Sequence, residues 1–234
     1  MSLTEDLVAA YRILAEFRII DAYGHVSVRS DRDPNRYLLA RSLAPALVTE
    51  ADIIEYDLDS NALDANGRVS VTERFIHGEA YRARPEVMAV VHNHSPTVVP
   101  FSVTQVPLRP LFHMAAFVGL GVPTFEIRDV ELGTDMLVRS PSLGKALARV
   151  LGDKPAALMR GHGAVVVGEN LPRAVGRSIY LEQSAQMQLQ AMQIAGPGAI
   201  TYLDDEEVLA GSRTQDYARA WPMWRENALA TLNQ

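Results

Sequence analysis

Three histidines have the residue type and spacing of a metal site: His92 and His94 in the segment His-Asn-His, and His162 further along the chain. Residues 87–91 form a near-continuous apolar run, which is typical of a strand buried on both faces. If that strand continues through the histidines, its period of two places His92 and His94 on one face. Neutral imidazoles are good ligands for a divalent metal, and three of them leave a coordination position open for water or substrate.

The third histidine lies between Gly161 and Gly163, and the apolar run of residues 164–167 follows it. Glycine lets the backbone approach a ligand closely, so this is a second strand-associated histidine element. The chain contains no cysteine, which leaves histidine and carboxylate as the available ligands. We therefore predict one divalent metal per chain, zinc in the first place, with manganese and iron(II) as alternatives.

Glu73 admits two interpretations. Residues 70–73, Ser-Val-Thr-Glu, match a helix capping box in which Glu73 would reach back to the amide of Ser70. His77 lies one turn later on the same face of the expected helix, where the two side chains could hydrogen-bond each other. A carboxylate brought close to a metal-bound substrate would instead serve as a general acid or base. From these residues alone, the capping box is the stronger interpretation.

Length, composition and charge limit the classes of protein to which the chain can belong. With 234 residues, of which 48% are hydrophobic, the chain is expected to fold as one domain over residues 1–234. A net charge of −6 without any basic run argues against nucleic-acid binding. No stretch approaches about 18 uninterrupted apolar residues, and the acidic residues 1–6 lack the pattern of a signal peptide. We expect a cytoplasmic protein that binds neither nucleic acid nor membrane.

Hydrophobic periodicity and turn residues predict alternating helices and strands. Helices are expected from the Ser2-x-x-Glu5 cap, over residues 72–84, near residue 97, over residues 142–151, and from residues 170–172 to about 194. Strands are expected over residues 26–28, 37–40, 53–58, 87–94, 124–127 and in two segments of 157–167. A helical tail from about residue 203 is expected to end in a helix from about Thr214 that Pro222 interrupts. The pattern predicts an α/β fold, a three-layer α/β/α domain with a mixed, mostly antiparallel central sheet.

Over residues 3–200, the order and spacing of these motifs resemble the class II aldolase/adducin family. Residues 24–29, Gly-His-Val-Ser-Val-Arg, are similar to a strand of that family that reads Gly-Asn-hydrophobic-Ser-x-Arg. A helix–strand core of the family resembles residues 73–81, with Glu, His and Tyr at four-residue spacing, followed by residues 90–95. Residues 160–164, Arg-Gly-His-Gly-Ala, are similar to the segment that holds its third metal histidine.

The resemblance implies a fold of the class II aldolase type, with a metal bound by His92, His94 and His162. It implies that Glu73 is an acid/base, or an occasional fourth ligand, and this replaces the capping-box interpretation. It also implies a homotetramer with active sites between subunits.

The chain departs from the sugar-phosphate aldolases of that family where those enzymes bind phosphate. His25 replaces an asparagine, residues 41–45 replace a loop with a Ser-Gly or Thr-Gly pair, and residues 71–72 replace Ser-Ser. Backbone amides freed by glycine are what normally hold a phosphate, and Leu43 and Val71 remove both space and donors. Binding of a phosphorylated sugar is therefore not expected.

These changes resemble the branch of the family that contains decarboxylases of hydroxylated aromatic or pyridine dicarboxylates, of the 3,4-dihydroxyphthalate type, and of related enol carboxylates. The resemblance implies a metal-dependent carboxy-lyase for a small-molecule carboxylate, with the metal as Lewis acid and electron sink. An arginine suits such a substrate because its guanidinium holds a carboxylate by two hydrogen bonds. The candidate proton donors are Glu73, His25 and His113, and the candidate substrate-binding residues are Arg29, Arg41, Ser42 and Thr72.

Two alternatives remain. The first is a class II aldolase, epimerase or dehydratase that acts on a phosphorylated sugar. The second is a non-enzymatic, adducin-like interaction module, which would be expected to have lost the metal histidines that this chain retains. Arg82 is expected to be an ordinary surface charge.

Overall fold

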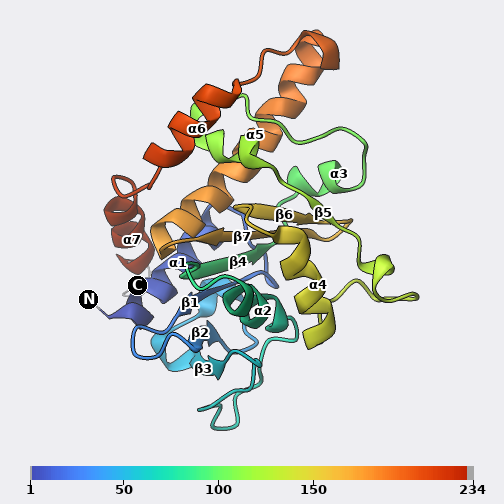
Figure 1. Cartoon of the computed structure of the whole chain (residues 1–234). Coiled ribbons are helices and arrows are strands. Elements are labelled where there is room, and N and C mark those ends of the chain that lie inside the picture. The colour runs from blue at the N-terminus through green and yellow to red at the C-terminus, as the bar shows by residue number, and fades with distance from the viewer. Residues whose placement is uncertain (1, 231–234) are drawn as a thin grey trace.

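Seven strands form one mixed sheet in the computed structural model, which describes residues 2–230 (Figure 1). The strands are β1 (His25–Arg29), β2 (Arg36–Ala40), β3 (Ile53–Asp57), β4 (Ala89–Asn93), β5 (Thr124–Phe125), β6 (Ala156–Met159) and β7 (Gly163–Gly168). Their order is β3-β2-β1-β4-β7-β6-β5, and every neighbouring pair is antiparallel except β5 with β6. This confirms the predicted α/β class with its mixed, mostly antiparallel sheet. Met1 and residues 231–234 of the predicted domain lie outside the described residues.

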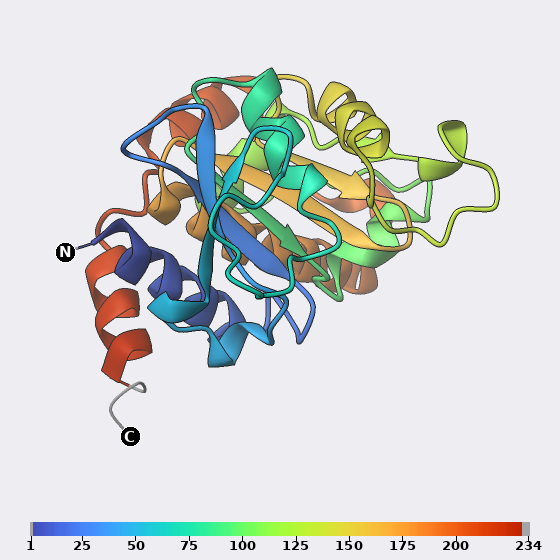
Figure 2. The ribbon, with the colours of Figure 1, turned by 90° about the horizontal axis from the view of Figure 1, so that it is seen from below.

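Helices cover both faces of the sheet, which gives the predicted three layers (Figures 1 and 2). One face carries α1 (Leu3–Glu16) and α5 (Leu171–Ala195), and the other carries α2 (Phe75–Ala83) and α4 (Pro141–Leu151). The remaining helices are α3 (Val98–Ser102), α6 (Asp205–Thr214) and α7 (Trp221–Ala230), with the short 3-10 helices η1 (Pro45–Leu47), η2 (Glu50–Asp52), η3 (His113–Leu120), η4 (Ile127–Asp129) and η5 (Pro197–Ala199).

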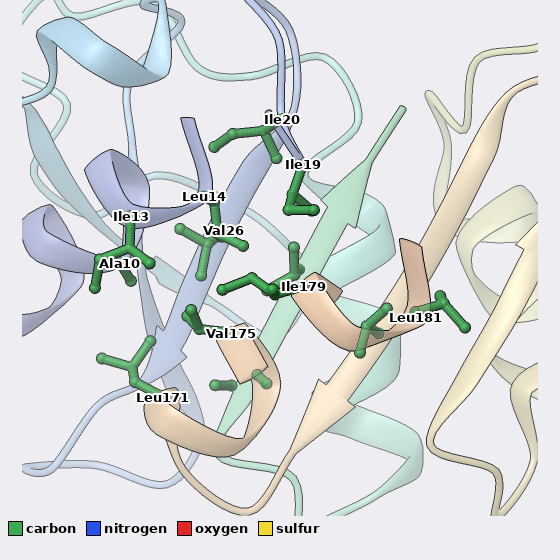
Figure 3. Packing of buried hydrophobic residues seen from close by; sticks show 14 of the residues in the cluster. Ala10, Ile13, Leu14, Ile19, Ile20, Val26, Leu171, Val175, Ile179 and Leu181 are labelled. Carbon is green, nitrogen blue, oxygen red and sulfur yellow. The ribbon is translucent and has the colours of Figure 1, made fainter. Parts of the chain in front are cut away.

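The side chains of β1 alternate between these two layers. Val26 packs between Leu14 of α1 and Ile179 of α5, in the cluster that Figure 3 shows. Burial of an aliphatic side chain of this kind stabilises the fold by roughly 1.5–3 kcal/mol. Because the period of a strand is two, His25 and Ser27 project from the opposite face, toward α2. The apolar packing on one face thus fixes the direction of the polar side chains on the other.

The start of α2 differs from the prediction. The helix begins at Phe75, not at residue 72, and Ser70 does not cap it: the residue before the helix is Arg74, and no side chain caps that end. Glu73 faces away from the helix and accepts a hydrogen bond from the Val138 amide at 2.8 Å. The capping-box interpretation is therefore wrong. The bond that Glu73 and His77 could have formed does not occur either: His77 hydrogen-bonds to His25 and Ser27 of β1.

The C-terminal tail contains two helices where the sequence predicted one. Asp204 and Glu207 form a capping box that starts α6. Pro222 does not interrupt a helix but is the second residue of α7, where its missing N–H costs nothing. Figure 1 shows α7 beside α1, and Arg225 joins the two helices through ion pairs with Glu5 and Asp6. No helix within residues 2–230 is long and apolar enough to cross a membrane.

Candidate metal centre and active site

Four side chains that can ligate a metal converge on the α2 face of the sheet. His92 is the second-last residue of β4 and His94 follows the strand, His162 lies in the loop between β6 and β7, and Glu73 precedes α2. One potential ligand atom from each of the four lies within 4.8 Å of those of the others. The antiparallel pairing of β4 with β7 produces this arrangement, because it places Asn93 opposite Ala164.

Two glycines allow the His162 loop to approach the end of β4. A Cβ atom on Gly163 would lie 1.9 Å from the carbonyl oxygen of Asn93, so no larger residue fits there. Gly161 has a φ of +63°, in the left-handed region that favours glycine. The glycines that marked this histidine in the sequence are therefore required by the local backbone.

The Nδ1 atom of each histidine has an oxygen partner. His92 Nδ1 lies 3.2 Å from the carbonyl oxygen of Ala164, and His162 Nδ1 lies 2.9 Å from that of Met136. His94 Nδ1 lies 3.2 Å from a carboxylate oxygen of Asp21. A neutral imidazole that donates its Nδ1–H to oxygen keeps the Nε2 lone pair free. All three rings are thus held in the tautomer that ligates through Nε2.

The free Nε2 atoms provide a test of whether the cluster fits a metal. Nε2 of His92 and of His94 is buried and has no hydrogen-bond partner within the described residues. A buried polar atom left without a partner costs about 1–3 kcal/mol, so such a pair calls for a ligand. Glu73 adds a carboxylate oxygen 3.6 Å from Nε2 of both His92 and His162. Three imidazole nitrogens and one carboxylate oxygen form a donor set that fits a divalent metal.

Burial sets the charge of the cluster. It lowers the pKa of His92 well below its ordinary value, an effect that the neighbouring histidines reinforce. Burial and the nearby His94 lower the pKa of His162 to about 4. At neutral pH these two imidazoles are neutral and carry their one proton on Nδ1, so no proton competes for Nε2. Burial has the opposite effect on Glu73 and raises its pKa to about 7, although the Val138 amide and Arg139 oppose the shift.

The sequence analysis missed two residues that orient the ligands. Asp21 supports His94 and is itself held by the amides of Tyr23 and Gly24. The turn signal was readable, but the pairing with His94 depends on the fold. Met136 has a φ of +75°, rare for a residue with a side chain, and this conformation directs its carbonyl oxygen at His162. A backbone contact of this kind leaves no signal in residue types.

A cavity of about 240 Å³ opens beside the cluster. His25 of β1 and three predicted substrate-binding residues, Arg41, Ser42 and Thr72, line it. The other lining residues include Tyr11, Ala22, Tyr23, Gly24, Leu43, Val71 and Leu137. His25 and His92 are register partners in β1 and β4, and their rings lie 5.0 Å apart, which places His25 beside the cluster.

Two candidates lie away from this cavity. The guanidinium of buried Arg29 donates hydrogen bonds to the carbonyl oxygens of Val87 and Tyr81, both at 2.9 Å, and to two further carbonyls. Its donors are used by the backbone, so its predicted role in holding substrate is corrected to a structural one. His113 is exposed in η3 and does not line the cavity of its own chain. Arg82, as expected, is a partly exposed residue in an ion pair with Asp59.

Known proteins of similar sequence include decarboxylases, and those of similar structure include an aldolase. The chain is 33% identical over 240 residues to decarboxylase tropJ from Talaromyces stipitatus, which covers 93% of this chain and 90% of that protein. It is 29% identical to a 3,4-dihydroxyphthalate decarboxylase from Arthrobacter keyseri, over 87% of this chain and 84% of the relative. Among solved structures, L-fuculose 1-phosphate aldolase from Glaciozyma antarctica has a TM-score of 0.80 and 26% identity, over 99% of this chain and 90% of that one.

The family itself follows from the extent of the match. Residues 5–189 match the family described as Class II Aldolase and Adducin N-terminal domain, and this segment contains the whole Glu73 and histidine cluster. This confirms the resemblance to the family that the motifs predicted. It also confirms that the chain resembles the decarboxylases of the family. The chain belongs to the class II aldolase and adducin family.

Proposed function

We propose that the protein is a divalent-metal-dependent decarboxylase that releases carbon dioxide from a hydroxylated aromatic or pyridine dicarboxylate, or from a related enol carboxylate. The similarity to two decarboxylases, one of them named for 3,4-dihydroxyphthalate, supports the reaction class. The observation that carries the substrate class is the wall of the cavity beside the metal cluster.

That wall combines apolar and aromatic side chains with a single fixed cation and the hydroxyls of Ser42 and Thr72. The apolar and aromatic part of the wall includes Tyr11, Leu43, Val71 and Leu137. The cavity has a volume of about 240 Å³, which suits a compound of one ring, since pockets for larger, drug-sized ligands have volumes of about 300–1,000 Å³. Among the lining residues, Arg41 is the one arginine or lysine. Its Nε pairs with Asp52 at 2.6 Å, which holds the side chain in place and leaves its terminal nitrogens for a substrate carboxylate.

A phosphorylated sugar fits this wall less well. The structural similarity to L-fuculose 1-phosphate aldolase keeps an aldolase, epimerase or dehydratase as the alternative function. A phosphate, however, needs a cradle of backbone amides or several cations. Leu43 and Val71 line the cavity instead, and Arg41 is its one arginine or lysine. The presence of all four cluster side chains also favours an enzyme over an adducin-like interaction module.

The roles of the residues follow from their positions. A divalent metal held by His92, His94 and His162 would supply a Lewis acid for the electron pair that remains when the carbon–carbon bond breaks. Glu73 lies beside those ligands, and burial raises its pKa to about 7, so near neutral pH it can hold a proton. We assign it the protonation of the substrate carbon that loses carbon dioxide. Solvent then returns the proton to the carboxylate.

Three further features belong to the same proposal. The metal is zinc in the first place, with manganese or iron(II) as alternatives. The protein is a homotetramer whose active sites lie between subunits, and His113 reaches the cavity of a neighbouring copy, since it does not line its own. The cytoplasm is the proposed location.

The test is a panel of substrates offered to the zinc-, manganese- and iron(II)-loaded enzyme. Hydroxylated phthalates, hydroxylated pyridine dicarboxylates and enol carboxylates should release carbon dioxide, detected as bicarbonate in a coupled assay. Ketose 1-phosphates should not be cleaved. Turnover of a ketose 1-phosphate without carbon dioxide from any acid of the panel would replace this proposal by the alternative.

A further inference from the structure

A chain of hydrogen bonds leads from the cavity into the interior of the protein. His25 Nδ1 lies 2.6 Å from His77 Nε2, and His77 Nδ1 lies 2.6 Å from the hydroxyl of Ser27. That hydroxyl lies 2.7 Å from the hydroxyl of Tyr81. All four side chains are at most 3% exposed. Only His25 lines the cavity, so the other three act on a substrate through His25 alone.

Tyr81, at the inner end of this hydrogen-bond chain, sets the direction in which its members donate. Burial raises the pKa of Tyr81, so its hydroxyl keeps its proton and acts as a donor. The Ser27 oxygen is the hydrogen-bond acceptor found for it within the described residues. The Val90 amide lowers the Tyr81 pKa, as a donor directed at the phenolic oxygen does. Reversing the direction of donation would leave the buried Tyr81 proton without an acceptor, which is unfavourable.

The protons of the other three groups follow from that direction. Ser27 accepts from Tyr81 and therefore donates to His77 Nδ1. Burial lowers the pKa of His77 to about 3, so the ring is neutral and carries its one proton on Nε2. His77 then donates to His25 Nδ1, and a ring whose Nδ1 accepts a hydrogen bond carries its one proton on Nε2.

We propose that His77, Ser27 and Tyr81 hold His25 in the tautomer with its proton on Nε2, so that the cavity presents a fixed N–H donor to an oxygen of the substrate. The three residues are positioning residues. The inference rests on the proposed function, in that the oxygen belongs to the carboxylate or hydroxyl of an acid substrate. It assigns different roles to two of the candidate proton donors: His25 binds an oxygen of the substrate, and Glu73 supplies the proton to the substrate carbon.

Arg29 supports the far end of this chain. Its guanidinium lies 4.8 Å from the centre of the Tyr81 ring and donates to the Tyr81 carbonyl oxygen. Tyr81 is thereby fixed against β1, where its hydroxyl meets Ser27. Arg29, which the sequence indicated as a substrate ligand, thus contributes to the site by supporting Tyr81.

The tautomers can be measured without turnover. In zinc-loaded protein labelled with ¹⁵N in the histidine rings, His25 and His77 should each show a protonated Nε2 and an unprotonated Nδ1. Their signals are assigned by their loss in His25→Gln and His77→Gln. Ser27→Ala and Tyr81→Phe remove the donors that set the direction, so both rings should shift toward the Nδ1-protonated form. Affinity for phthalate, an unreactive dicarboxylate, should fall by roughly tenfold in both variants.

Tyr37→Phe is the matched control. Tyr37 is a buried tyrosine beside Tyr81, but its hydroxyl donates to Ser60, outside the chain. This variant should keep the wild-type tautomers and phthalate affinity. A proton on Nδ1 of either histidine in the wild type, or unchanged tautomers in both Ser27→Ala and Tyr81→Phe, overturns the inference. If the tautomers are as stated and no acid of the panel releases carbon dioxide, the proposed function fails and the positioning of His25 stands.

Discussion

Oδ1 of Asp21 lies 3.2 Å from Nδ1 of His94, although the two are 73 positions apart in the sequence. Partial burial opposes ionisation of Asp21, but the amides of Tyr23 and Gly24 and the imidazole of His94 outweigh it, so its pKa lies below the ordinary value. An ionised carboxylate behind a metal-ligating histidine fixes the ring and makes its other nitrogen more basic. Asp21 is therefore part of the metal centre without touching the metal position.

Replacement of Asp21 tests that relationship. Asp21→Ala should weaken metal binding by roughly 10- to 100-fold, because His94 loses the partner that orients it. Competition against a chromophoric chelator measures the affinity directly. Asp31→Ala removes an exposed carboxylate of similar size and should leave the affinity unchanged. Equal affinities in Asp21→Ala and the wild type would refute the supporting role.

Glu73→Gln should separate metal binding from catalysis. The amide keeps the shape of the side chain but cannot donate an acidic proton, so turnover should fall by roughly a hundredfold or more. Metal content, measured by elemental analysis, should remain near that of the wild type, because three histidines hold the metal. Arg82→Ala, which breaks ion pairs with Asp59 and Glu79 away from the cavity, should have little effect on either. A Glu73→Gln variant that retains full turnover would exclude Glu73 as the proton donor.

His25→Asn should reduce turnover by a similar factor of roughly a hundred, also without loss of metal. Asparagine is shorter and cannot reach both His77 and the cavity, so the oxygen of the substrate loses its donor. Steady-state kinetics and metal analysis on the same preparation provide the measurement. Loss of metal in this variant would show that His25 acts on the ligands and not on the substrate.

The local part of the site could be predicted from the sequence. Period two along one strand placed His92 and His94 on a common face, and that prediction needs no knowledge of the rest of the chain. The contacts across the sheet could not be predicted in this way. Asp21 meets His94, and His25 meets His77, because β1 pairs with β4 and α2 packs on β1. Residue types alone do not reveal those neighbours.

Errors of the sequence analysis arose where one pattern fits two structures. Residues 70–73 match a capping box, yet residues 72–74 form a turn and Glu73 accepts from the Val138 amide. Asp204 and Glu207 carry the same signal and do cap α6, which the sequence analysis overlooked. In the first case tertiary contacts outweighed the local preference, and in the second they agreed with it.

Arg41→Ala should impair substrate binding more than chemistry. Loss of a hydrogen-bonded charge partner removes about 1.5–3 kcal/mol, so KM for a dicarboxylate should rise by roughly 10- to 100-fold while kcat changes less. Arg36→Ala is a control, since Arg36 pairs with Asp33 and Glu55 and does not line the cavity. A fall in kcat with unchanged KM would place Arg41 in the chemical step instead.

Mixed oligomers test whether His113 acts in a neighbouring subunit. His113→Phe and Glu73→Gln should each have little activity alone. If one site takes Glu73 from one chain and His113 from another, unfolding and refolding the two variants together should restore part of the activity, because some sites receive both native residues. Light scattering should report a tetramer for each variant and for the mixture. A monomeric protein, or a mixture without regained activity, would exclude a shared site.

The metal-free protein should lose stability in acid. Burial lowers the pKa of His77 from 6.5 to about 3, so the unfolded chain binds a proton that the folded chain does not. The stability contributed by neutral His77 is present above pH 6.5 and is lost as the pH falls toward 3, by up to about 1.4 kcal/mol per pH unit. The lowered pKa values of His25, His92 and His162 act in the same direction.

The raised pKa of Glu73 changes the stability with pH in the opposite direction, but four histidines oppose this one carboxyl group. Its pKa is raised from 4.5 to about 7, so its contribution is present below pH 4.5 and lost as the pH rises through 7. Four histidines against one carboxyl should make the free energy of unfolding in urea fall steadily below pH 6.5. His77→Gln should show a shallower pH dependence. Tyr37→Phe, which removes a buried hydrogen bond but no group that titrates in this range, should lower the whole curve and keep its slope. An equal slope in His77→Gln and wild type would show that His77 is not held neutral by the fold.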